Sequence, residues 1–166
     1  MSSNTTPAPT GPGALVLEEQ VCFALSVAAR SVVAVYKPLL EPLGLTHPQY
    51  LVMLALWEHE SISVRDLSAR LHVDPGTLSP LLKRLDAAGL VRRARRPDDE
   101  RSLAVTLTPE GRALREDALG VPAAVLSRLG LEPDELVSLR EQLTTVIAAA
   151  SAHRAGDDGG NVVADG

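Results

Sequence analysis

Residues 61–107 read SISVRDLSARLHVDPGTLSPLLKRLDAAGLVRRARRPDDERSLAVTL, and this stretch decides the fold. Ser63 is suited to cap a short helix, with Asp66 three residues later as a capping-box partner. Asp74-Pro75 has the cap and first residue of a second helix, which Ala88-Gly89 should stop. The spacing predicts a helix–turn–helix, with a distorted early turn in its second helix because of an internal proline.

The pattern changes after this helix pair. Residues 90–95 and 102–107 are short segments, and the second has apolar residues at every other position. The sequence RPDD (96–99) between them is typical of a turn. A two-stranded hairpin is therefore expected, and a helix–turn–helix followed by such a hairpin is a winged helix–turn–helix.

Helical patterns flank this block on both sides. One runs from Leu15 to Leu40, with an end or kink expected at Lys37-Pro38. Further helices should open at His47-Pro48, Thr108-Pro109 and Glu132-Pro133. The last helix has an apolar heptad seam at Leu136, Leu139, Leu143, Val146 and Ala150. The predicted class is mainly α with a small β-hairpin, a winged helix–turn–helix with N- and C-terminal dimerisation helices.

The organisation along the chain follows from these patterns. Residues 1–13 and 154–166 are rich in Pro, Ser, Thr, Gly or Asp and are expected to be disordered tails. Residues 14–153 form the predicted domain. Within it, the DNA-binding lobe covers about 47–108, and the dimerisation helices cover about 15–43 and 109–153.

Composition excludes several classes of protein. The 166 residues include one Cys, so neither an internal disulfide nor a multi-cysteine zinc site is expected, and no metal, cofactor or catalytic motif is visible. No run reaches the ~18 uninterrupted apolar residues of a membrane helix. The first basic residue is Arg30, so a charged signal-peptide start is absent and a cytoplasmic location is expected.

Charge points to nucleic acid as the partner. The net charge is −5, yet residues 83–101 carry seven basic and four acidic side chains, so this segment is +3 and the remainder −8. A solvated charge run is the plain alternative, which the adjacent helix–turn–helix disfavours. The second helix suits the major groove and the arginine-rich hairpin the minor groove. The candidate DNA contacts are Thr77, Ser79, Lys83, Arg84, Arg93, Arg95, Arg96 and Arg101.

Two details of this surface stay open in the sequence. Arg101 is placed to contact DNA or to pair with Asp99 across the hairpin. At the start of the second helix, backbone amides are expected to favour phosphate. A winged helix that reads a two-fold site is normally presented twice, so we expect a homodimer on an inverted repeat of double-stranded DNA.

Cys22 has two interpretations. It lies among Val21, Phe23 and Leu25, where a free cysteine is an ordinary apolar filler. It also lies about seven residues inside its expected helix, beyond the first turn where the helix dipole favours a thiolate. From the residues alone, core filling is the simpler interpretation and a redox role the alternative.

The residues also carry a family resemblance. DPGTLSPLLKRLDAAGLVRR (74–93) and DDERSLAVTLTPEGR (98–112) resemble the MarR family of bacterial transcription regulators. VCFAL (21–25) and the stretch YKPLLEPLGLTHPQYLVMLALWEHE (36–60) are similar to its OhrR branch. That resemblance implies a repressor that senses organic hydroperoxides through Cys22 and then releases its operator. With one cysteine, the oxidised sulfur would need an external low-molecular-weight thiol or further oxidation.

The resemblance also implies hydroxyl groups that support the thiol. Tyr36 matches one family tyrosine, whereas His47 and Ser26 replace two others. If protonated, His47 would favour a thiolate more than a phenol does. Tyr36 lies fourteen residues after Cys22, which is about 21 Å along a straight helix, so contact requires a second subunit or a broken helix.

Two other functions remain as alternatives. One is a MarR-type regulator gated by a small ligand such as a phenolic compound, with Cys22 incidental. The other is a thiol peroxidase, which would leave the basic hairpin without a role.

Overall fold

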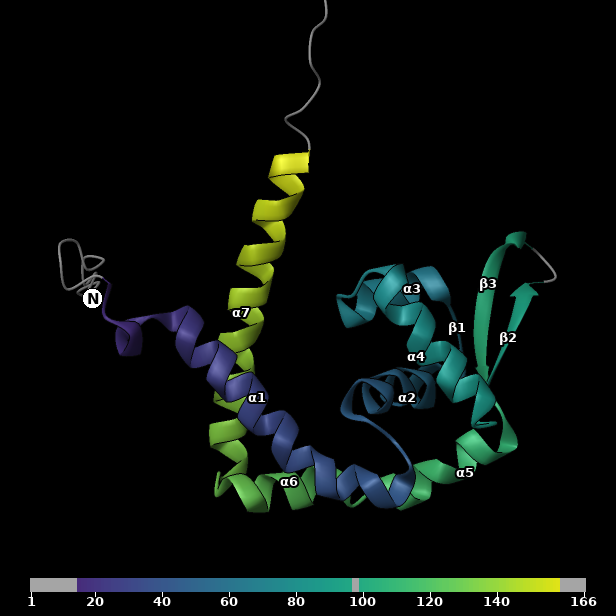
Figure 1. Cartoon of the computed structure of the whole chain (residues 1–166), viewed down its shortest axis with the longest axis horizontal. Coiled ribbons are helices and arrows are strands. Elements are labelled where there is room, and N and C mark those ends of the chain that lie inside the picture. The colour runs from purple at the N-terminus through teal and green to yellow at the C-terminus, as the bar shows by residue number, and fades with distance from the viewer. Residues whose placement is uncertain (1–14, 97–98, 159–166) are drawn as a thin grey trace, which may run out of the picture. The chain divides into compact units, whose positions relative to one another are not determined.

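The computed structural model describes residues 15–96 and 99–158, except the side chains of residues 96, 99–102 and 154–158. The chain divides into two compact units, residues 1–121 and 122–166 (Figure 1). The predicted tail 1–13 and the turn residues Pro97 and Asp98 lie outside the described residues.

The first unit opens with a short 3-10 turn, η2 (Leu17–Glu19), and the long helix α1 (Val21–Leu40). The sequence placed the helix start at Leu15, which is wrong, because the backbone of Gln20 is extended and acts as the N-cap. The helix also continues through Pro38 to Leu40. Pro38 lies in the last turn and has no N–H for the Ala34 carbonyl, but the Glu41 N–H still closes the helix on the Lys37 carbonyl, so the helix does not end at Pro38.

The next helix follows directly. The 3-10 turn η3 (Glu41–Leu43) ends at Gly44, whose φ of +66° is a left-handed conformation that glycine adopts at little cost. Helix α2 (His47–His59) begins with a capping box between Thr46 and Gln49. The predicted opening at His47-Pro48 is confirmed.

The helix–turn–helix forms as the sequence predicts. Ser63 accepts a hydrogen bond from the Asp66 amide at the start of α3 (Val64–Leu71). Helix α4 (Pro75–Ala87) is capped by Asp74. Its residues at spacings of four and three, Leu78, Leu82 and Leu85, are fully buried, so apolar packing fixes which face of α4 meets solvent.

The hairpin is part of a larger sheet than predicted. Strands β2 (Val91–Arg96) and β3 (Asp99–Leu107) pair antiparallel, with an irregularity between Arg95 and Arg96. A third strand, β1 (Ser61–Ser63), pairs with β3 and gives the order β1-β3-β2. The prediction of two strands is incomplete, because β1 is three residues long and has one apolar residue, Ile62, too few to show alternation.

Helix α5 (Pro109–Ala118) closes the core of this unit, and Thr108 caps it as predicted. The core is aliphatic and comes from α1, α2, α3, α4 and the sheet. Its fully buried side chains are Leu40, Val52, Met53, Leu56, Leu67, Leu78, Leu82, Leu85, Val91 and Val105. The sparse aromatic residues of the sequence are consistent with this Leu- and Val-filled interior.

The second unit contains two helices, α6 (Val121–Leu129) and α7 (Pro133–Asp158). Gly130, with a φ of +64°, separates them. The backbone of α7 runs to Asp158, beyond residue 153 where the sequence placed the end of the domain. Four residues of the predicted heptad seam, Leu136, Leu139, Leu143 and Val146, are exposed in the single chain.

Helix α1 is also strongly apolar on its surface. Within the segment Val21–Leu43, an 18-residue window has a mean hydropathy of 1.4 and 6% of its residues are buried, so by length and composition alone the segment would suffice for a membrane span. Arg30 lies near the middle of this segment and interrupts it, so the segment has no run of ~18 uninterrupted apolar residues. An exposed apolar surface of this length is typical of a contact with another protein or with a membrane.

Replacing Gly111 by Ala should destabilise the first unit. Gly111 is buried in α5, and a Cβ at this position would overlap the backbone carbonyl of Leu90. Because both groups are backbone-fixed, we expect a loss of about 1–3 kcal/mol in the free energy of unfolding. Chemical denaturation measures it. Gly120→Ala, where a Cβ meets open space, is the matched control, and equal stability of both variants would contradict this packing.

Candidate DNA-binding surface and cysteine site

The amino end of α4 is held by a side-chain cap. The Thr77 amide donates to Asp74 Oδ1 at 2.9 Å, and the Thr77 hydroxyl donates to Asp74 Oδ2 at 2.6 Å. These hydrogen bonds hold the pKa of Asp74 below its ordinary value, so the carboxylate is charged. The Asp74 carboxylate already accepts the hydrogen bond of the Thr77 amide, and its negative charge repels a phosphate group. The expectation that the α4 amides favour phosphate therefore does not hold at Thr77.

The remaining predicted contacts of α4 lie away from its buried leucines. Thr77, Lys83 and Arg84 are exposed and Ser79 is partly buried. Ser79 and Lys83 are four residues apart and Thr77 and Arg84 seven apart, so they form two stripes, about 130° apart around the helix, that border its solvent-facing side. The hydroxyl of Thr77 donates to Asp74, which leaves its oxygen free to accept a hydrogen bond.

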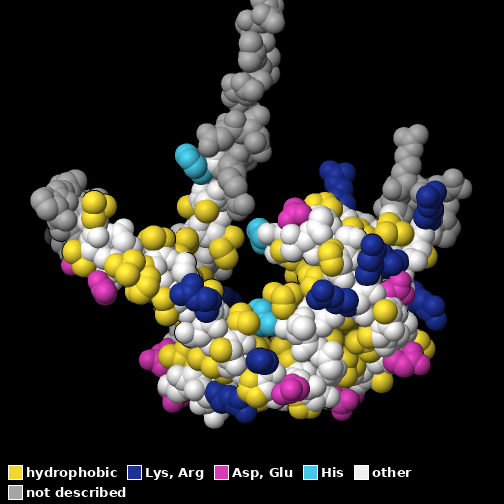
Figure 2. Space-filling model, viewed as in Figure 1, with side chains coloured by type: hydrophobic (Ala, Val, Ile, Leu, Met, Phe, Trp, Pro, Cys, Tyr) yellow, Lys and Arg dark blue, Asp and Glu magenta, His cyan; other side chains and the backbone are white. Residues whose placement is uncertain are grey.

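The arginines of the hairpin do not share one environment. Arg92 and Arg95 are exposed. Arg93 is partly buried, and its Nε donates to Asp86 Oδ2 of α4 at 3.1 Å. The side chains of Arg96 and Arg101 lie outside the described residues. In Figure 2, dark blue Lys and Arg side chains gather over the region where Figure 1 labels α4 and the sheet.

The base of the hairpin is fixed by contacts that the sequence analysis missed. The Thr108 hydroxyl donates to the Gly89 carbonyl at 2.6 Å, which joins the end of β3 to the end of α4. The indole N–H of Trp57 donates to the Gly111 carbonyl at 2.8 Å. A Trp and a Thr–Pro cap are visible in the sequence, but their partners depend on how α2, α4 and α5 pack.

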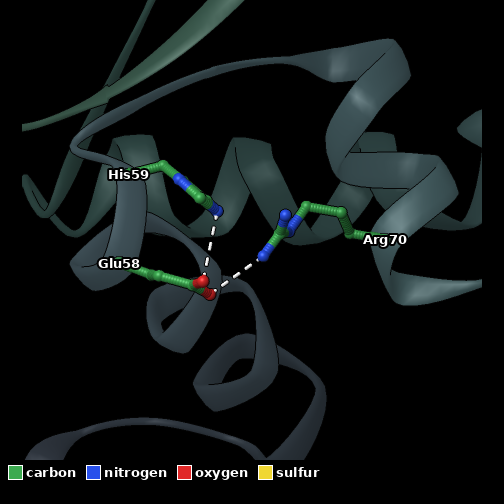
Figure 3. Close-up of polar contacts among 3 residues, drawn as sticks. All are labelled: Glu58, His59 and Arg70. Carbon is green, nitrogen blue, oxygen red and sulfur yellow. Dashed lines mark hydrogen bonds and ion pairs between the residues drawn. The ribbon is translucent and has the colours of Figure 1, made fainter.

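A second missed cluster joins α2 to α3. Arg70 Nη2 lies 2.9 Å from Glu58 Oε2, and His59 Nε2 lies 3.5 Å from Glu58 Oε1 (Figure 3). The carboxylate of Glu58 is 62% exposed, so this cluster stabilises the fold by less than about 1 kcal/mol. It links the carboxyl end of α2 to α3 within the helix–turn–helix region.

Cys22 is an exposed free thiol in the first turn of α1, because the helix begins at Val21. The expectation that Cys22 lies about seven residues inside the helix is wrong. The argument that Cys22 is too far from the helix start for the helix dipole to favour a thiolate is therefore wrong as well. Core filling is also excluded within the single chain, since the side chain is exposed. Ser26, one turn further on, is exposed as well.

Tyr36 belongs to an aromatic group at the other end of α1. Its ring centroid lies 5.0 Å from that of His47 and 5.9 Å from that of Tyr50, which in turn lies 6.2 Å from Trp57. Burial raises the pKa of Tyr36 and of Tyr50, so both phenols keep their proton at neutral pH and remain donors. Tyr50 was not among the site residues predicted from the sequence, although it lies in this group.

Burial lowers the pKa of His47, so the neutral imidazole dominates at neutral pH. A protonated His47 that favours a thiolate is therefore disfavoured by this environment. His47 also lines a cavity of about 580 Å³ between α1 and the start of α2, with Arg30, Val33, Lys37 and Leu45 among its walls.

Because α1 is continuous, Cys22 and Tyr36 are far apart within one chain. Fourteen residues of continuous helix separate them by about 21 Å. A tyrosine side chain does not span this distance, and the alternative of a broken helix is removed. Contact between these two groups requires two chains.

Comparison with known proteins fits this architecture. The model of the MarR family matches residues 45–103, which cover the helix–turn–helix and most of the sheet. An organic hydroperoxide resistance transcriptional regulator of Bacillus subtilis (strain 168) is 41% identical over 131 residues, covering 79% of this chain and 89% of the relative. The chain belongs to the MarR family. It is a DNA-binding transcriptional regulator, and its relatives are regulators rather than enzymes.

Other MarR-family proteins resemble it over a similar span. The regulator TtmR of Methylorubrum extorquens (strain PA1) is 43% identical over 150 residues, covering 83% of this chain and 77% of the relative. The solved structure of reduced AbfR bound to DNA has a TM-score of 0.71 and 32% identity, covering 81% of this chain and 94% of that one. The predicted family and winged-helix fold are confirmed. Among the described residues, no group of His, Cys, Asp and Glu is arranged to hold a metal ion.

The neutral state of His47 predicts a pH-dependent stability. Because its folded pKa lies below its ordinary value of 6.5, its contribution is complete above pH 6.5 and is lost as pH falls through the folded pKa. We expect the midpoint of thermal unfolding to fall over this range, and His47→Gln to flatten the fall. His72→Asn, at an exposed left-handed C-cap that Asn tolerates, is the control. A pH profile unchanged by His47→Gln would exclude this role.

Proposed function

We propose that this protein is a homodimeric repressor that binds an inverted repeat of double-stranded DNA and releases it when an organic hydroperoxide oxidises Cys22. One observation carries the proposal: an exposed thiol begins an apolar helix whose phenol, Tyr36, is beyond its reach in the same chain. A second copy brings the two together. A DNA target places the protein in the cytoplasm.

The exposed apolar surfaces support the dimer. On α1, Val21, Val27 and Val33 are exposed, and on α7 the apolar side chains of the heptad seam are exposed. The exposed valines of α1 lie six residues apart and so point to different sides of that helix, whereas the exposed side chains of α7 follow three- and four-residue spacing and form a stripe. A folded monomer leaves both apolar surfaces in water. Pairing of these helices with those of a second chain removes this surface and presents two winged helices to a two-fold site.

The basic surface supports the DNA contacts. Ser79, Lys83, Arg84 and Arg95 lie on solvent-facing parts of α4 and β2, where they reach phosphates and base edges. Thr77 would accept a hydrogen bond, because its proton is given to Asp74. Arg96 and Arg101 keep their assignment to the minor groove on sequence grounds.

The chemistry at Cys22 has two steps. The thiolate attacks the OH oxygen of the hydroperoxide and breaks the O–O bond, which gives a sulfenic acid and an alkoxide. The alkoxide takes a proton from solvent and leaves as an alcohol. A low-molecular-weight thiol then displaces water and forms a mixed disulfide, because the chain has no second cysteine. The phenol of the partner's Tyr36 would donate a hydrogen bond to the reduced sulfur, and the adduct would displace it.

The replacements of two family tyrosines fit a weaker set of donors. Ser26 offers one hydroxyl a helical turn from Cys22. His47 is neutral and its ring packs edge-on against Tyr36, so it would offer one ring N–H as a donor rather than a charge.

Cys22→Ser tests the switch. A duplex selected from a random pool with the reduced wild-type protein serves as the operator. Cumene hydroperoxide with free cysteine should release the wild type and leave Cys22→Ser bound, as measured by fluorescence anisotropy. Tyr36→Phe should slow the response and leave reduced-state binding within about threefold, since it removes one hydrogen bond near the sulfur. Release of Cys22→Ser under the same conditions would refute the redox proposal.

Leu143→Glu tests the dimer. A charge on the exposed apolar face of α7 should shift the protein from dimer to monomer in analytical ultracentrifugation. It should also weaken operator binding, because a monomer contacts only one of the two half-sites. Gln142→Glu adds the same charge at an exposed neighbour and should stay dimeric. A monomer that binds the full operator as tightly as the wild type would contradict this assembly.

The cavity beside His47 favours one other candidate function. It is largely apolar, and its wall has two basic side chains, Arg30 and Lys37, against one acidic side chain, Glu41, so its net charge of +1 suits an aromatic acid. In that case a phenolic acid alone would release the operator from Cys22→Ser. A thiol peroxidase remains disfavoured by the family, and steady turnover of hydroperoxide with added thiol would be needed to support it.

A further inference from the structure

The ion pair between Arg93 and Asp86 joins the two elements that meet DNA. Asp86 lies near the carboxyl end of α4, and Arg93 is the third residue of β2. Arg93 Nε is 3.1 Å from Asp86 Oδ2, and the two side chains are only 27% and 30% exposed. This geometry is unlike that of the neighbouring Arg92 and Arg95, which are exposed.

The position of Asp86 needs a partner. A carboxylate in the last turn of a helix lies at the negative end of the helix dipole and is disfavoured there. The guanidinium of Arg93 compensates this charge in a partly buried setting, where the attraction is screened less than at the surface. Breaking the pair would leave a partly desolvated charge on either side.

The pair also spans a sharp change of direction. Helix α4 ends at Ala87 and β2 begins at Val91, with Gly89 at a φ of +75° between them. The Leu90 amide closes this turn on the Leu85 carbonyl at 3.0 Å. The Arg93–Asp86 contact therefore adds a side-chain tie between α4 and β2 beyond the backbone turn.

We propose that Arg93 is a positioning residue, which sets the angle between α4 and the hairpin instead of contacting DNA itself. Arg96, the last residue of β2, lies three residues beyond Arg93, or about 10 Å at 3.3 Å per residue. A tilt of about 15° at Arg93 moves the backbone of Arg96 by about 3 Å, which is the length of a hydrogen bond. Contact of α4 with one groove and of the hairpin with another thus depends on this tie.

The inference rests on DNA binding by the winged helix and does not involve Cys22, so the test uses the reduced, full-length protein. Asp86→Asn separates the two possible roles of Arg93. It makes the protein one charge more positive, so a purely electrostatic contribution would tighten DNA binding. The positioning role predicts the opposite, because the tie is lost.

The experiment compares Asp86→Asn, Arg93→Gln and the double variant on the duplex selected with the reduced wild type. Each single variant should weaken DNA binding by about 5- to 30-fold. The affinity of the double variant should not fall below that of the single variant with the lower affinity, because both changes remove the same ion pair. The slope of log affinity against log salt should equal that of the wild type in all three. Arg92→Gln is the matched control for removing one positive charge from the same strand.

Footprinting separates this role from general loss of stability. Hydroxyl-radical protection in the minor groove should be lost in Asp86→Asn, while dimethyl sulfate protection in the major groove persists. Tighter binding by Asp86→Asn, with a salt slope reduced by about 0.9 in Arg93→Gln, would overturn the proposal and make Arg93 a phosphate contact. Parallel loss of both protections would overturn it as well and assign the pair to folding alone.

Discussion

The apolar surface of α1 is the constraint on which the rest of the molecule depends. The helix is continuous from Val21 to Leu40, and most of its apolar length is exposed in one chain. Its carboxyl end is different, since Leu40 is fully buried in the same core as the helix–turn–helix. The amino end of α1 is therefore exposed, and its carboxyl end is packed into the core of the winged helix–turn–helix.

In the proposed dimer, this arrangement would connect the α1 contact to α4 through the core. Leu40 and Leu45 are buried beside α2, and α2 supplies Val52, Met53 and Leu56 to the core that holds Leu78, Leu82 and Leu85. Well-packed interiors transmit displacement because they deform little. The indole of Trp57 on the Gly111 carbonyl and the Thr108 hydroxyl on the Gly89 carbonyl tie the same core to the base of the hairpin.

Sequence was most informative where the physics is local. The caps at Ser63, Asp74 and Thr108 involve groups within three residues of one another, so the helix starts could be predicted from residue type and spacing. The start of α1 could not, because Gln20 makes no side-chain cap and the pattern of apolar residues continues upstream. Strand β1 exists through its pairing with β3 some forty residues later, which a three-residue segment does not show.

The candidate site shows the same division. A run of arginines predicts a basic surface, but the pairing of Arg93 with Asp86 depends on the angle between α4 and β2, which no spacing rule gives. Likewise His47 is a plausible cation in the sequence, and only its burial in the fold favours the neutral form. Identical residue types acquire different roles because the environment decides which charges are desolvated.

The size of the required switch limits how oxidation would act. To move a repressor from 99% bound to 1% bound, its affinity must change by about 10⁴, and the chemical change must distinguish the two states by that factor. A sulfenic acid adds one oxygen to an exposed thiol, which is a small perturbation of volume. A mixed disulfide adds a whole side chain where the partner's α1 would pack, and a close-packed interface does not absorb that volume without moving. The long, rigid α1 then carries the displacement to Leu40, so in the proposed mechanism the adduct acts through volume more than through charge.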